Sequence, residues 1–211
     1  RVRLAPSAGA VRLRGRVRLD GAPGSGAVVS CGEASAGCDE SGEFALVLPG
    51  PGDHTLTFEF ERPELDESLS VGVPLEVPNV AEYACDLSIP LARMRGRVIA
   101  GDEFPGEIGV RAEGESGDGV GLLWSTAYCD AEGHYELRVV PGRVTVSAGG
   151  PPASAWAEAA RTVVVASGQE LEGIDLTLSR GARIHGRALL ESGQPAAGAQ
   201  LWGSSSDRRT S

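Results

Sequence analysis

The residues able to carry metal or acid–base chemistry are few in this chain and widely spaced. The three histidines are His54, His134 and His185, and none begins a His-x-x-Glu or His-Glu-x-x-His pattern. A zinc site needs several such ligands at a spacing that places them together. We therefore predict no metal site, and we expect His54 and His134 to lie on the surface at the starts of strands.

Other catalytic signatures are also missing from the sequence. It contains no Gly-x-Ser-x-Gly elbow, no P-loop and no dinucleotide-binding glycine pattern. Glu113, Glu115 and Asp118 bring carboxylates to a glycine-rich stretch, but their spacing matches no established calcium loop. We interpret this stretch as a hairpin loop and predict no catalytic residue, no cofactor and no enzymatic activity.

The four cysteines are candidates for a disulfide or for core packing. Cys31 and Cys38 flank a short loop, and pairing of the flanking strands would place them opposite each other at disulfide distance. Against this, Cys129 occupies the position of Cys38 in a second copy of the same motif and has no obvious partner, which is typical of a small core residue. A Cys31–Cys38 bridge and a free, packed thiol both remain open.

Aromatic side chains are the candidates for contact with a ligand, because a ring offers a large flat surface to a sugar or a protein. Trp124, Trp156, Trp202 and Tyr128 are the candidates, and core packing is the alternative for each. Trp156 follows a Pro-Pro turn and is expected to be the most exposed. It is therefore the one residue to which we assign a ligand contact.

Charge and composition exclude several classes of partner. The net charge of −10 would repel a nucleic acid and offers little attraction to anionic lipid. No apolar run is long enough to insert into a membrane. The 30 glycines and 13 prolines favour strands separated by turns over helices, and only residues 153–160 have a helix-like composition.

Internal repeats organise the whole chain. Gly-Arg pairs begin at Gly15, Gly96 and Gly186, one small domain apart. Further landmarks recur in the same order after the first two pairs: residues 38–46 match residues 129–137, residues 48–50 match residues 140–142, and residues 86–89 match residues 175–178. We predict the last strand of a preceding repeat at 1–13, full repeats at 14–93 and 94–180, and the start of a third at 181–211.

Alternation with a period of two predicts the strands that position these residues. Val11, Leu13 and Val17 alternate with arginines, and Leu56 and Phe60 alternate with polar residues. Such half-buried strands, joined by Asp-x-x-Gly and Pro-Gly turns, predict an all-β protein of tandem Greek-key β-sandwich repeats. The arginines at positions 12, 14, 16 and 18 are a possible basic stripe or simply the solvated face of one strand.

The order of motifs resembles the carboxypeptidase regulatory-like domain, which implies a transthyretin-like, or prealbumin-like, sandwich related to Ig-like folds. The matching motifs are Gly-Arg-Val, Gly-Gln-Pro-Ala-Ala-Gly-Ala, Asp-x-x-Gly-x-aromatic-x-Leu, Leu-Pro-Gly and Asp-Leu-x-Leu. They cover nearly the whole chain but are turn and core signals. The chain is also similar to collagen-binding B-type adhesin domains, yet it has no lysine for their lysine–asparagine isopeptide bond.

These observations favour a non-catalytic structural, spacer or adhesion-type array in a secreted or cell-surface bacterial protein. The expected location is extracellular, on the cell surface or periplasmic, and the chain, which begins at Arg1, is expected to be a fragment of a longer protein. Neighbouring repeats are the expected partners, with a glycan or a cell-surface protein as further candidates. The alternatives are a carbohydrate-binding module, by analogy with related folds, and an accessory domain beside a peptidase.

Overall fold

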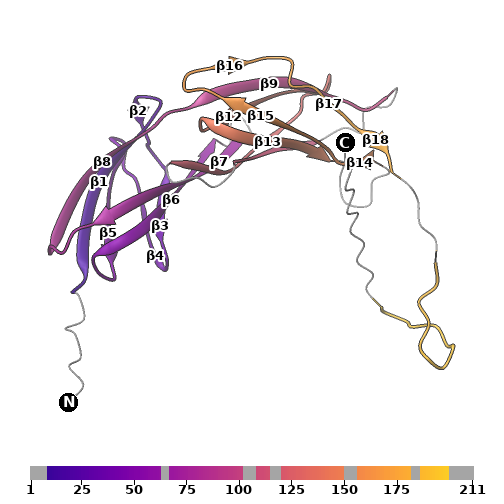
Figure 1. The fold of residues 1–211 in the computed structure, drawn as a ribbon, viewed down its shortest axis with the longest axis horizontal. Helices are drawn as coiled ribbons and strands as arrows, with labels where there is room; N and C mark the ends of the chain where they lie inside the picture. The colour runs from indigo at the N-terminus through magenta and orange to yellow at the C-terminus, as the bar shows by residue number, and fades with distance from the viewer. Residues whose placement is uncertain are drawn as a thin grey trace. The chain divides into compact units, whose positions relative to one another are not determined.

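The computed structural model describes residues 9–62, 67–101, 108–114, 120–149, 156–181 and 186–199 (Figure 1). These residues are all-β, and the chain divides into two units, Arg1–Gly181 and Ala182–Ser211. Both predicted full repeats lie in the first unit. Across the described ranges there is no helix of the length and apolarity needed to cross a membrane.

The first repeat is a sandwich of two sheets. In one sheet, β1 pairs antiparallel with β5 and β2 and parallel with β8; the other sheet has the order β4-β3-β6-β7. The strands are β1 (Val11–Leu19), β2 (Ala22–Pro23), β3 (Val28–Cys31), β4 (Ala34–Gly37), β5 (Glu43–Leu48), β6 (Gly52–Arg62), β7 (Glu67–Val77) and β8 (Glu82–Ile89).

The second repeat has the same arrangement. Its strand β9 pairs antiparallel with β12 and parallel with β16 and β17, and its other sheet has the order β11-β10-β13-β15. The strands are β9 (Ala92–Ile99), β10 (Gly109–Gly114), β11 (Gly121–Tyr128), β12 (His134–Val139), β13 (Gly142–Gly149), β14 (Trp156–Ala157), β15 (Ala159–Val165), β16 (Glu170–Leu171), β17 (Leu176–Thr177) and β18 (Ser179–Arg180). The prediction of tandem all-β sandwiches is confirmed.

One sheet runs through both repeats. Strand β11 of the second repeat pairs antiparallel with β7 of the first, so that two four-stranded sheets form a single eight-stranded sheet. The register runs from Gly121 opposite Gly72 to Thr126 opposite Ser68, with an irregularity between Leu122 and Trp124. The backbone groups of two sheet edges are thereby satisfied by each other.

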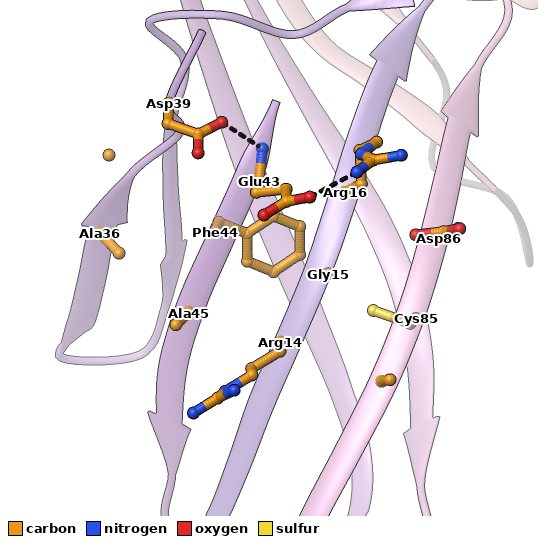
Figure 2. Close-up of a pocket in the computed structure, with 12 residues that line it drawn as sticks. Arg14, Gly15, Arg16, Ala36, Asp39, Glu43, Phe44, Ala45, Cys85 and Asp86 are labelled. Atoms are coloured by element: carbon orange, nitrogen blue, oxygen red, sulfur yellow. Dashed lines mark hydrogen bonds and ion pairs between the residues drawn. The ribbon is translucent and has the colours of Figure 1, made fainter. Parts of the chain in front are cut away.

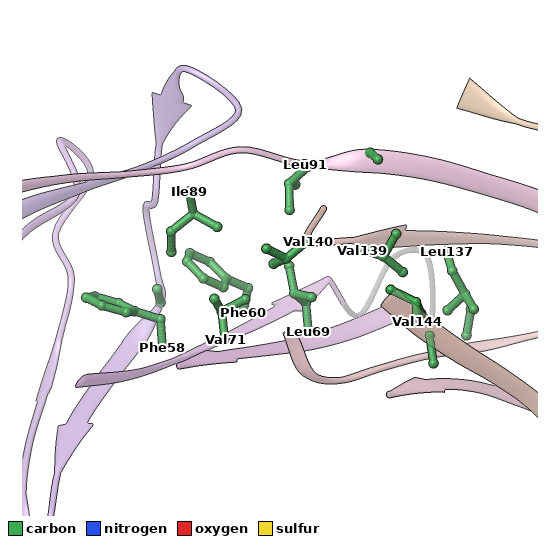
Figure 3. Close-up of a cluster of buried hydrophobic side chains, with 14 of the residues drawn as sticks. Phe58, Phe60, Leu69, Val71, Ile89, Leu91, Leu137, Val139, Val140 and Val144 are labelled. Atoms are coloured by element: carbon green, nitrogen blue, oxygen red, sulfur yellow. The ribbon is translucent and has the colours of Figure 1, made fainter. Parts of the chain in front are cut away.

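The hydrophobic core follows the predicted alternation. Val11, Leu13 and Val17 of β1 are fully buried while the arginines between them face outward. The Phe44 and Phe58 rings pack edge to face at 5.6 Å between centroids. Figure 3 shows that the buried side chains continue from the first repeat into the second; those labelled are Phe58, Phe60, Leu69, Val71, Ile89, Leu91, Leu137, Val139, Val140 and Val144.

The helix-like composition of residues 153–160 does not produce a helix in residues 156–160, which the structure describes; strands form there instead. Trp156–Ala157 forms β14, which pairs with β18, and β15 begins at Ala159 and pairs with β13. Backbone pairing with neighbouring strands outweighs the weak local helix propensity of this alanine-rich segment.

Among its described residues, the second unit contains a turn enclosed by an isolated bridge, followed by a second turn at residues 197–198. Leu189 and Pro195 form an isolated bridge, and the Ala196 amide donates to the Ala188 carbonyl at 2.9 Å. The Leu190 amide donates to the Gln194 carbonyl at 2.9 Å, which closes the tip of the turn.

Candidate functional site

Two grooves lie at equivalent positions in the two repeats. The first is lined by β1, β5, β8 and the segment before β5 (Figure 2), and the second by their counterparts in the second repeat. The first contains Arg14, Gly15, Arg16, Ala36, Gly37, Asp39, Glu43, Phe44, Ala45, Ala84, Cys85 and Asp86. The second contains Arg95, Gly96, Arg97, Asp130, His134, Tyr135, Glu136, Glu172, Gly173 and Asp175.

The aspartate in each groove caps a turn. Asp39 Oδ1 accepts hydrogen bonds from the Ser41 hydroxyl at 2.8 Å and from the backbone amides of Ser41 and Glu43, each at 2.9 Å. These bonds lower the pKa of Asp39, the Ser41 hydroxyl having the largest effect. A carboxylate held in this way stabilises the hairpin and is not a free acid or base.

The second repeat uses the same cap. Asp130 Oδ1 accepts from the backbone amides of His134 at 2.7 Å and Glu132 at 3.0 Å. These bonds lower the pKa of Asp130, and the His134 amide contributes most. His134 is exposed, as predicted, and its Nδ1 lies 3.3 Å from Asp130 Oδ2. The Asp-x-x-Gly motif is therefore a turn signal.

The glycine of the Gly-Arg motif in each of the two full repeats is required by close packing. A Cβ on Gly15 would collide with the Cys85 carbonyl and the Phe44 ring, and a Cβ on Gly96 would collide with the Ile174 carbonyl. In the second repeat the Tyr135 hydroxyl donates a hydrogen bond to that same Ile174 carbonyl. Burial is the main cause that raises the pKa of Tyr135, so its proton stays in this bond.

Within the described residues, two of the four arginines in the predicted stripe pair with carboxylates. On β1, Arg16 pairs with Glu43 and Arg12 lies 3.4 Å from Glu82. On β9, Arg93 and Arg95 share Glu136, at 3.2 and 2.7 Å. Arg14 lies opposite Ala45 and Ala84 on the neighbouring strands, whereas its counterpart Arg95 lies opposite Glu136. This pattern supports the interpretation as a solvated strand face, since exposed arginines of both strands pair with carboxylates.

The predicted Cys31–Cys38 pair is not brought together. The Cys38 amide donates to the Ala27 carbonyl at 2.7 Å, so Cys38 lies opposite Ala27, whereas Cys31 lies opposite Ala34. Ala27 and Cys31 are separated by about 13 Å along an extended strand at about 3.3 Å per residue, whereas a disulfide needs Cα atoms within about 7 Å. Both residues are free thiols.

Three of the cysteines behave as packing residues: Cys38, Cys85 and Cys129. Burial raises the pKa of Cys38 and of Cys129 to about 11 in each case. Cys85 is half-buried beside the first groove, and burial followed by the Asp86 charge raises its pKa. These thiols are poor nucleophiles at neutral pH.

Cys31 has a partner that the sequence did not indicate. Its Sγ lies 3.7 Å from Nδ1 of His54, and His54 Nε2 lies 2.9 Å from the Gly50 carbonyl oxygen. His54 is half-buried, which differs from the expected surface position. The ladder between β3 and β6 explains the contact, because it aligns Ser30 with Thr57 and so brings the ends of the two strands together. The third histidine, His185, lies outside the described residues.

The predicted ligand residue Trp156 is half-buried, with the Arg180 guanidinium 5.7 Å from its ring centroid. Tyr128 is instead the most exposed aromatic of the candidates that the structure describes, with 53% of its surface accessible. It is the last residue of β11; four residues earlier in the same strand, Trp124 is half-buried, and the neighbouring Leu123 is 42% exposed. Trp202 lies outside the described residues.

The junction between the repeats holds a buried ion pair. Arg138 Nε donates to both carboxylate oxygens of Glu67, at 2.8 and 3.0 Å, and the Arg138 amide donates to Oε1 at 3.2 Å. Only 6% of the Glu67 side chain is exposed, and Arg62 Nη1 lies 3.8 Å from it. Beside this pair, the hydroxyls of Ser68 and Thr126 are 2.6 Å apart across the β7–β11 ladder.

No metal-binding group of three or more histidine, cysteine or acidic side chains occurs in the described ranges. Glu113, one of the acidic residues considered for calcium, pairs with Arg111 at 2.8 Å, while Glu115 and Asp118 lie outside those ranges.

No protein-family model matches the chain, and no curated protein matches it. Several solved structures are similar at low identity. The Bacillus anthracis TIE protein has a TM-score of 0.32 and 11% identity over 82% of this chain, which spans about a third (34%) of that protein. The shaft pilin SpaA of Lactobacillus rhamnosus GG has a TM-score of 0.30 and 11% identity, over 83% of this chain and 100% of the pilin.

A streptococcal ancillary pilin has a TM-score of 0.28 and 11% identity, over 81% of this chain and 62% of that one. Similarities of this degree transfer no function. The resemblance to the carboxypeptidase regulatory-like domain accordingly rests on the sequence motifs alone.

Proposed function

We propose that this chain is a non-catalytic structural or adhesion-type repeat array that acts as a stiff spacer in a secreted or cell-surface protein. The observation that carries the proposal is the single eight-stranded sheet. It arises because β7 of one repeat pairs with β11 of the next and joins their two four-stranded sheets. Two sandwiches joined only by a linker would move independently. Shared strand pairing, by contrast, ties their orientations together.

The junction adds side-chain contacts to this backbone connection. The Glu67–Arg138 ion pair is largely shielded from water; Arg138 Nε–H is shared between the two carboxylate oxygens, and the Arg138 backbone amide donates to one of them, so Glu67 is held by charge-assisted hydrogen bonds. The apolar side chains of Leu69, Leu91 and Val140 lie at the same place in a continuous core (Figure 3). Bending the junction would expose this core and leave a buried carboxylate without its partner.

The groove geometry supports a non-catalytic function. Asp39 and Asp130 are committed to turn caps, and Glu43 and Glu136 to arginines. A general acid or base must be free to exchange a proton with a substrate. These carboxylates stabilise strands and turns instead.

Residual dipolar couplings test the stiffness that a spacer needs. One alignment tensor is expected to fit the backbone amides of both repeats, and in Glu67→Ala, which loses a side-chain contact of the junction but keeps the shared sheet, the fit to one tensor is expected to become poorer. Glu61→Ala is the matched control, because Glu61 is an exposed residue of the neighbouring strand β6. Two different tensors in the unmodified chain would contradict the proposal.

A carbohydrate-binding function is the second candidate, and it is favoured by the exposed Tyr128 at the end of β11. Ser125 and Ala127 point into the core, so Trp124 and Tyr128 lie on the outer face of the sheet near the junction. A flat aromatic surface suits stacking on a sugar ring. An accessory function beside a peptidase remains a hypothesis that depends on neighbouring domains.

A glycan-array screen distinguishes these candidates. Saturable binding that is lost in Tyr128→Ala and retained in Tyr128→Phe would support the carbohydrate-binding function. Trp156→Ala is expected to leave such binding unchanged, because that ring already lies against Arg180. Absence of binding by the unmodified chain to any glycan would remove this candidate.

A further inference from the structure

Cys31 and His54 form a dyad that the proposed function does not use. They lie at the ends of the neighbouring strands β3 and β6, in the sheet that contains both repeats. Cys31 Sγ and His54 Nδ1 are 3.7 Å apart, within the range of a sulfur hydrogen bond. The pair thus combines a nucleophile with an adjacent base.

A backbone carbonyl fixes the orientation and the tautomer of His54. Its Nε2 lies 2.9 Å from the Gly50 oxygen, and a carbonyl oxygen can only accept, so Nε2 carries the proton. In the neutral ring the lone pair is then on Nδ1, which faces the Cys31 sulfur. This is the arrangement in which an imidazole accepts a proton from a thiol.

Cys31 is accessible as well as paired. It is the last residue of β3 and is followed by the turn at Gly32 and Glu33, and it is only partly buried. Burial raises the pKa of Cys31, so the resting state is a thiol that donates to Nδ1. Its reactivity therefore depends on transfer of that proton to His54 as the sulfur attacks.

The remaining cysteines provide an internal comparison. Cys38 has only 8% of its surface exposed, and burial, followed by the charge of the next aspartate, raises the thiol pKa of Cys85 and of Cys129. Within the part of the chain that the structure describes, Cys31 is the cysteine with a sulfur–imidazole contact.

We propose that the Cys31–His54 dyad is a base-assisted thiol site that undergoes exchange with disulfides. His54 Nδ1 takes the thiol proton, and the Cys31 sulfur attacks one sulfur of a disulfide R–S–S–R. The new Cys31–S–S–R bond forms as the R–S–S–R bond breaks, and the departing R–S⁻ takes the proton back from His54. The incoming disulfide is the only oxidant, and the product is a mixed disulfide on the first repeat.

The test is the rate at which the native chain reacts with 5,5′-dithiobis(2-nitrobenzoic acid), with the modified residue identified by peptide mass mapping. One thiol per chain is expected to react at least about tenfold faster than the others, as a general base would provide, and to map to Cys31. Cys31→Ser should abolish the fast phase, and Cys85→Ser, the matched control, should retain it.

His54 is tested with two variants whose folding is checked by thermal unfolding. His54→Phe removes the base, and His54→Asn retains a hydrogen-bond acceptor without its basicity. Both are expected to slow the Cys31 reaction by about tenfold or more. Oxidised glutathione should modify the same residue.

Three results would overturn the proposal. The fast phase could map to another cysteine, or a folded His54→Phe or His54→Asn chain could react at the unmodified rate. The third is Cys31 already bonded to Cys38 in the unreduced protein, which would leave no thiol to react.

Discussion

At the scale of single residues, Gly96 and Tyr135 explain why the Gly-Arg motif occurs together with the Asp-x-x-Gly-x-aromatic motif. The Tyr135 hydroxyl reaches across β9 to the Ile174 carbonyl, and the space it crosses is free because residue 96 has no side chain. Phe44 lies over Gly15 in the same way in the first repeat. In these two repeats, the aromatic side chain on the neighbouring strand therefore requires glycine in the Gly-Arg motif.

Gly96→Ala is expected to destabilise the protein by about 1–3 kcal/mol, the cost of overpacking a well-packed site. The added Cβ would displace both the Ile174 carbonyl and the Tyr135 hydroxyl. Urea denaturation measures the change. Gly109→Ala is the control, since its Cβ would meet Tyr128 at an ordinary 3.7 Å, and an equal loss in both variants would contradict the packing explanation.

The turn cap at Asp39 predicts a pH dependence. Hydrogen bonds lower its pKa in the folded protein, so its contribution to stability is complete above the unfolded value of about 3.9 and is lost as the pH falls through the folded value. Asp39→Asn should reduce this acid-induced loss of unfolding free energy between about pH 4 and pH 2. Asp53→Asn, at an exposed position in β6, is the control.

At the scale of elements, strands β7 and β11 determine how the repeats are joined. Either would be an exposed sheet edge in an isolated repeat, and such edges invite pairing with other chains. Here each edge is covered by the other, and Glu67 at the start of β7 binds Arg138 at the end of β12. The junction therefore depends on three strands.

A double-mutant cycle on Glu67 and Arg138 measures the strength of this contact. Glu67→Gln or Arg138→Met alone is expected to cost about 3–5 kcal/mol, because each removes the nearest partner of a shielded charge; Arg62, 3.8 Å from Glu67, is a weaker neighbour. The double variant should cost less than the sum of the two. The exposed Arg93–Glu136 pair is the control, with an expected coupling of at most about 1 kcal/mol; similar couplings in both pairs would argue against a special junction.

At the scale of the whole first unit, the shared sheet and core predict that the two repeats unfold together. Among the described residues, the core is continuous from β6 to β13, since Phe60, Leu69 and Val140 belong to one buried cluster. A perturbation in one repeat should therefore reach the other. Two independent sandwiches would instead melt separately.

Phe58→Ala tests this coupling, because Phe58 is fully buried in the first repeat and its loss should cost about 3–5 kcal/mol. Trp124 and Trp156 report on the second repeat, and Trp202→Phe removes the remaining tryptophan. The fluorescence midpoint in urea is expected to fall together with the circular-dichroism midpoint. A fluorescence transition that stays in place would show that the repeats are uncoupled.

The sequence by itself determined the all-β class, the repeats and the buried face of strands such as β1, because alternation and turn residues act locally. Only the tertiary structure decided that β7 pairs with β11, that Trp156 lies beneath Arg180 and that Cys31 faces His54 and not Cys38. These depend on which edges and strand ends meet. Residues far apart in the chain set that choice, and no local pattern records it.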